Sequence, residues 1–135
     1  MKFEFFEHTA DAKFRAYGKN LDECFKNAAL AMFSIMVDSK KIDAKIKKKI
    51  TIEGSDLKSL LYNFLEKLIY LLDVEFFVLK KVSSLKIKGN VLEAVIEGQK
   101  VPKNVELGCE VKAVTYNSMI IKNKEPYMVQ VVLDL

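Results

Sequence analysis

The feature that most constrains the fold is the apolar pattern of residues 57–72. Large apolar side chains recur there at intervals of three and four, which gathers them on one wide face of a helix. They are Leu57, Leu60, Leu61, Phe64, Leu65, Leu68 and Leu72. We expect Ser55 to cap this helix. Residues 21–36 repeat the pattern, with Asn20 as cap and Glu23 three residues later. Neither helix would be stable alone in water, so both need a sheet to cover their apolar faces.

Alternation with a period of two predicts that sheet. Two short strands are expected before residue 19, and another at residues 46–52. The stretches "EFFVLKKV", "SLKIKG" and "VLEAVIEG" read as three successive strands, with Gly89 and Asn90 in a tight turn. The stretches "GCEVKAVTYNSMII" and "YMVQVVLDL" form a final pair. The sequence therefore predicts a single α+β domain over residues 1–135, with two amphipathic helices packed on a mainly antiparallel sheet.

Composition excludes several classes of protein. No apolar run reaches the roughly 18 residues that a membrane span needs, and no secretory signal is recognisable. Cys24 and Cys109 are too few for a disulfide framework, so we expect two buried thiols in a reducing cytoplasm. The net charge of +4 owes much to Lys40–Lys49, interpreted as a solvated loop leading into a strand or as a patch for a phosphate backbone. No nucleophile elbow or phosphate-binding glycine loop is present, which argues against an enzyme.

The last two residues are the strongest candidates for a metal-binding site. The alternating pattern continues to Leu135, so Asp134 and the terminal carboxylate should lie side by side in a strand. Two carboxylates so close repel each other unless a cation or a partner offsets them, or unless both simply point into water. Asp11, in a polar break that also holds the single histidine, His8, is the natural third carboxylate. Spacing alone does not decide whether the three meet.

Longer segments resemble the archease family. They are "EHTADAKFRAYGKNLDECFKNAALAMFSIMVD", "SLLYNFLEKLIYLLDVE", "GCEVKAVTYNSM" and the terminal "VQVVLDL". The resemblance implies an accessory protein, not itself catalytic, of the RtcB-type tRNA-splicing ligase. Such a protein promotes guanylylation of the ligase and its multiple turnover on RNA, and it can broaden the choice of nucleoside triphosphate beyond GTP. It also implies a divalent cation held by Asp11, Asp134 and Leu135.

The resemblance implies Ca²⁺ first, and oxygen ligands of this kind also suit Mg²⁺ or Mn²⁺, with water completing the shell. Histidine matches such a site poorly, so we expect His8 and Thr9 to fix the local turn around it. The remaining candidates could line the same surface or serve the structure alone. They are Asp38, Asp73, and the pair Lys112 and Tyr116, which we expect to share one face of a strand. Archeases commonly carry histidine after this tyrosine, whereas this chain has Asn117, which removes a titrating group there.

Two other functions compete with this interpretation. A small metal-dependent phosphoesterase could use Asp11 and Asp134 to hold the ion that generates hydroxide. A general chaperone or RNA-binding module could instead use the Lys40–Lys49 patch, in which case RNA binding would depend strongly on salt.

Overall fold

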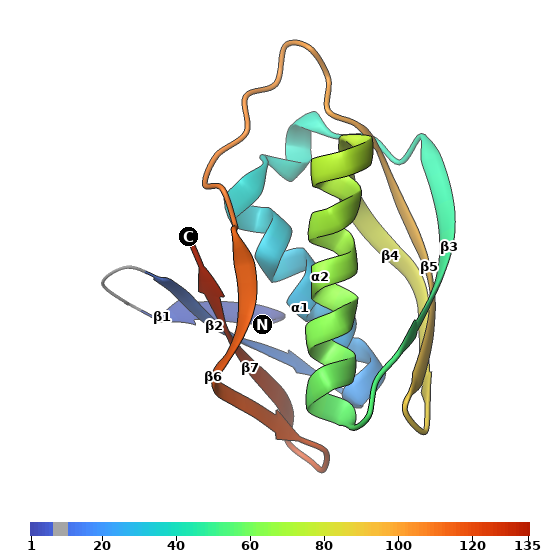
Figure 1. The fold of residues 1–135 in the computed structure, drawn as a ribbon, viewed down its shortest axis with the longest axis vertical. Coiled ribbons are helices and arrows are strands. Elements are labelled where there is room, and N and C mark those ends of the chain that lie inside the picture. Colours follow the sequence, from blue (N-terminus) through green and yellow to red (C-terminus); the bar gives the residue numbers. More distant parts are fainter. Residues whose placement is uncertain (7–10) are drawn as a thin grey trace.

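Two helices lie between two antiparallel sheets in the computed structural model, which describes residues 1–6 and 11–135 (Figure 1). One sheet has the strand order β1-β2-β7-β6 and the other the order β3-β5-β4. The strands are β1 (Phe3–Phe6), β2 (Asp11–Gly18), β3 (Ile46–Glu53), β4 (Phe77–Lys88), β5 (Val91–Lys100), β6 (Ala113–Lys122) and β7 (Tyr127–Asp134). The helices are α1 (Leu21–Met36) and α2 (Leu57–Glu75), with a short 3₁₀ turn, η1, at Ser39–Lys41. The predicted α+β class is confirmed.

The helices begin close to where their caps predict. The Asn20 side chain accepts the Glu23 N–H at 2.9 Å, and the Glu23 carboxylate reaches back to the N–H of Lys19 at 2.9 Å. The cap of α2 is Asp56, so the prediction of Ser55 is wrong by one residue. Asp56 accepts the Ser59 N–H at 2.8 Å, while the Ser59 hydroxyl accepts the N–H of Asp56 at 3.1 Å.

The core lies where the helices face each other and the two sheets. The apolar faces predicted for both helices are buried except for Leu57 and Leu72 at the ends of α2, which are partly buried, and the Phe25 and Phe64 rings stack with centroids 6.4 Å apart. Figure 1 shows α2 between β6 of the four-stranded sheet and β3 of the other. Neither helix in the described part of the chain is long and apolar enough to cross a bilayer.

Two strand predictions are wrong. The segment read as two strands before Gly89 is one continuous strand, β4, because register shifts near Leu79 and Val82 let the ladder continue. Residues 108–112 are not part of β6: Gly108 and Cys109 instead donate to the last carbonyls of α1. The turn at Gly89 and Asn90 is confirmed, and Gly89 has the positive φ, 62°, that such a turn favours.

One cysteine differs from expectation, whereas the lysine run agrees with the prediction of a loop that leads into a strand. Cys24 is buried, but Cys109 is exposed because it lies in the irregular segment before β6, so the prediction of two buried thiols is half right. The Lys40–Lys49 run is a loop only in its middle part. It begins in η1 and ends inside β3, where Lys47 and Lys49 are exposed.

Candidate functional site

Asp11 and Asp134 lie directly opposite each other at one end of the four-stranded sheet. Asp11 begins β2, Asp134 ends β7, and the antiparallel register pairs the two residues. Residues opposite each other in such a ladder project to the same face, with Cβ atoms about 5 Å apart. Asp134 is exposed and Asp11 partly buried. Two of the three predicted donors, from opposite ends of the chain, are therefore brought together.

The third donor is held beside them by the backbone. β7 lies between β2 and β6, and on the β6 side Asp134 is opposite Ala113. The N–H of Lys112 donates to the Asp134 carbonyl at 2.8 Å, which extends the ladder by one bond beyond β6. Leu135 packs against the core as a partly buried residue. Its main chain follows Asp134 directly, and the end of β7 lies beside the start of β2 (Figure 1).

Among the described residues, the predicted donors at this sheet end offer oxygen atoms. In residues 1–6 and 11–135, no group of three or more His, Cys, Asp or Glu side chains is placed to hold a metal ion. A cation at this sheet end would meet the Asp11 and Asp134 carboxylates and the main chain of Leu135. Such a set fits a hard divalent ion, which also keeps several water ligands.

The other candidate residues are spread over the molecule. His8 and Thr9 lie outside the described residues. Asp38 caps η1, where its carboxylate accepts the Lys40 N–H at 3.1 Å. Asp73 is exposed near the end of α2 and borders a cavity together with residues 107–111.

Lys112 and Tyr116 do not share a strand as predicted. Lys112 precedes β6, which begins at residue 113. The main chain of residues 108 and 109 is bonded to the end of α1, so this segment does not extend the strand. Tyr116 lies in β6 and stacks on Tyr62 of α2, with ring centroids 4.4 Å apart and planes 6° from parallel. Partial burial, then the neighbouring Tyr62 and Asp56, raise the pKa of the Tyr116 hydroxyl above its usual value.

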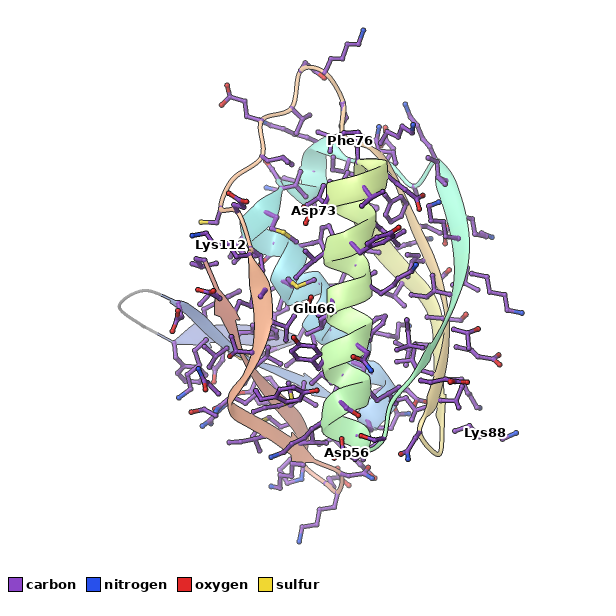
Figure 2. All side chains as sticks on the ribbon, viewed as in Figure 1. Asp56, Glu66, Asp73, Phe76, Lys88 and Lys112 are labelled. Carbon is purple, nitrogen blue, oxygen red and sulfur yellow. The ribbon has the colours of Figure 1, made fainter. Side chains whose placement is uncertain are left out.

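Sequence reasoning missed the contact between α2 and β6. β6 is an edge strand, and its Val114 N–H donates to the Glu66 carboxylate at 2.7 Å. Figure 2 shows Glu66 and Asp73 on the side of α2 toward β6. Tyr62 and Glu66 are four residues apart, so they share one side of a helix. That spacing was the one sign in the sequence that both residues face the same neighbouring strand.

A bulge in β6 occupies the position of Asn117. The pairing with β7 shifts between Thr115 and Ile120, and Ser118 adopts a positive φ of 52°. Gln130, only 2% exposed, spans this bulge by donating to the Ser118 carbonyl at 2.7 Å and accepting from Arg15 at 2.9 Å. Asn117 itself is exposed.

Comparisons with known proteins agree on one family. The sequence model of the archease protein family matches residues 3–135. The archease of Sulfurisphaera tokodaii is 43% identical over 130 residues, covering 95% of this chain and 94% of the relative. The archease of Methanosarcina barkeri is 39% identical over 140 residues, covering 99% and 96%.

Solved structures give the same result. The solution structure of Methanobacterium thermoautotrophicum protein 1598 has a TM-score of 0.85 and 38% identity, covering 99% of both chains. A Thermotoga maritima archease, described as a possible chaperone, has a TM-score of 0.68 over 96% of this chain and 94% of its own, and at 20% identity it shows the shared fold alone. With the family model matched over almost its whole length, this chain belongs to the archease family.

Proposed function

We propose that this archease is a non-catalytic activator of the RtcB-type tRNA-splicing ligase, acting through a divalent-cation site. In this proposal it promotes guanylylation of the ligase from GTP or a related triphosphate and so sustains repeated rounds of RNA joining. The ion, Ca²⁺ or Mg²⁺, is held by Asp11, Asp134 and the main chain of Leu135.

The observation that carries the proposal is the register of β2 and β7. It places two carboxylates opposite each other, and both favour a positive charge close by. Both residues are the first or last of a strand, so they lie at the margin of the sheet, and Asp134 is exposed there.

The residues of the chain have distinct parts in this proposal. The two carboxylates bind and orient the ion, and the Lys112 N–H holds the backbone of Asp134 in place. When bound, the ion supplies a positive charge with water ligands that phosphate oxygens can replace. Two side chains leave most of the coordination shell open, which suits a protein that completes a metal–nucleotide centre on a partner.

Ligase assays test the proposal directly. Substoichiometric amounts of the protein should raise both the guanylylation rate and the number of turnovers of the cognate RtcB-type ligase. Asp11→Asn and Asp134→Asn should each lose at least tenfold of this stimulation, since each removes one formal charge from the ion site. Asp43→Asn, which removes an exposed carboxylate from the loop before β3, is the matched control and should stimulate as the wild type does.

Three results would refute the proposal or redirect it. Unchanged guanylylation with the wild-type protein would exclude the activator role. If Asp11→Asn and Asp134→Asn stimulate the ligase as much as the control Asp43→Asn and the wild type do, the ion site is excluded. Release of phosphate from nucleotides or RNA ends by the isolated protein, lost in Asp11→Asn, would show a phosphoesterase instead.

A further inference from the structure

Phe76 combines two features that the fold itself does not require. It ends α2 in the left-handed conformation, with φ 57° and ψ 28°, where glycine or asparagine is the usual residue. The residue is also 61% exposed, so it adds little to the core. Glycine would serve the backbone as well, which leaves the exposed ring surface free to contact another molecule.

The ring borders a mostly apolar cavity of about 340 Å³ at the end of α2. Leu107, 46% exposed, borders the same cavity from the irregular segment before β6. Buried Met36 and Val111 also line it. The volume is at the lower end of the range for small-molecule sites, and it can accept one large apolar side chain.

Main-chain hydrogen bonds fix this cavity in shape. The N–H groups of Gly108 and Cys109 donate to the carbonyls of Met36 and Ile35 at 2.7 and 2.9 Å, which satisfies the end of α1. A Cβ on Gly108 would lie 2.8 Å from the Ile35 carbonyl oxygen, so the approach requires glycine. On the other side, the Phe76 carbonyl accepts the Val101 N–H at 2.9 Å. A cavity held in this way loses little conformational entropy on binding.

Two acidic residues at the cavity favour a positively charged group on the molecule that binds there. Asp73 and Glu110, both exposed, line the cavity of a chain whose net charge is +4. Lys112 follows two residues after Glu110, and its N–H is bonded to the Asp134 carbonyl. Figure 2 shows Phe76 and Asp73 at the same end of α2, and Lys112 at the start of β6. The cavity is thus linked through a two-residue segment to the proposed ion site.

We propose that this cavity is a docking site for a partner protein, which inserts one large apolar side chain flanked by a lysine or arginine. The apolar lining receives the first, and Asp73 with Glu110 attracts the second. This inference rests on the proposed function, in which the partner is the RNA ligase. The Lys112 main chain, bonded to Asp134, joins this cavity to the proposed ion site.

Binding of the cognate ligase to two cavity variants tests the site. Phe76→Gly removes the ring and keeps the backbone conformation, while Asp73→Lys reverses one charge. Each should raise the Kd for the ligase at least tenfold, whereas the Ca²⁺ affinity of the isolated variants should stay within twofold of wild type. Tyr70→Ala is the matched control: it removes another half-exposed aromatic ring of α2 that does not border the cavity, and its Kd should stay within twofold. Circular dichroism of each variant verifies the fold.

The outcomes separate this inference from the proposed function. If Phe76→Gly and Asp73→Lys bind the ligase as the wild type does, the docking site is refuted, and stimulation by the wild type still supports the activator role. If the wild type binds through the cavity without stimulating guanylylation, the activator role fails and the docking site stands. Concentration-dependent dimerisation lost in Phe76→Gly would assign the cavity to a second copy of this chain, which overturns the inference.

Discussion

The Asp134→Asn variant should be slightly more stable than the wild type in the absence of Ca²⁺ and less stable than the wild type in its presence. Without the ion, the wild type holds two carboxylates opposite each other in the β2–β7 ladder, and the variant holds one. With the ion, the wild type has the stronger site. The two conditions therefore give opposite signs for one substitution, which a purely structural effect would not produce.

The geometry sets the size of both effects. Two unit charges about 5 Å apart in a highly polar medium repel by about 0.8 kcal/mol. Physiological salt reduces this to about 0.4 kcal/mol. At a Ca²⁺ concentration of about 100 times the wild-type Kd, binding adds about 2.7 kcal/mol to the free energy of unfolding. A tenfold weaker site in Asp134→Asn would add about 1.4 kcal/mol, so the wild type should then lead by about 1 kcal/mol.

Thermal unfolding in chelator and in excess Ca²⁺ measures this directly. For a chain of this length, 1 kcal/mol corresponds to about 3–5 °C in Tm. The variant should thus melt slightly above the wild type in chelator and about 3 °C or more below it in Ca²⁺. The Tm of Asp43→Asn should differ from that of the wild type by the same amount in chelator and in Ca²⁺. An equal rise of wild type and Asp134→Asn on adding Ca²⁺ would contradict the reasoning, because the carboxylate would then contribute nothing to ion binding.

Three further predictions concern stability and reactivity. Glu66→Ala leaves an N–H on the edge of β6 without its charged acceptor and should lower the free energy of unfolding by about 1.5–3 kcal/mol in urea titrations, with Glu66→Gln losing less. Hydrogen bonds from Ser59 lower the pKa of Asp56 in the folded state, so the stability they add is present above the unfolded pKa and is lost as pH falls through the folded pKa. Urea titrations between pH 5 and pH 2 should therefore show a smaller acid destabilisation in Asp56→Asn. Burial raises the pKa of the Cys24 thiol to about 11, so a thiol reagent at pH 8 should modify Cys109 rapidly and Cys24 only after denaturation.

Local patterns predicted the helices well, because their physical causes are local. The apolar face of α2 follows from spacing alone. The error of one residue at its cap has a local cause too, since Ser55 and Asp56 are both good caps and the Ser59 hydroxyl is bonded to both N–H groups. Gly89 likewise marks its turn without help from distant residues.

The features that sequence did not predict depend on distant partners. Residues 108–112 alternate like a strand, yet their first two N–H groups serve the end of α1, and no local pattern indicates that choice. The meeting of Asp11 and Asp134 depends on the register of two strands from opposite ends of the chain. The polar break around Asp11 suggested the meeting, spacing left it open, and the resemblance to archeases favoured it. Glu66 was missed because an acidic residue beside the apolar face of a helix usually contacts water alone.

The lysines of β3 have a consequence for how the protein behaves at high concentration. β3 is an outer strand of its sheet, and an outer strand with unpaired main-chain groups is a template for intermolecular pairing. Lys47 and Lys49 project from it as exposed charges, so a second β3 approaching this strand would meet strong repulsion. The basic run thereby protects the molecule from aggregating through its own sheet.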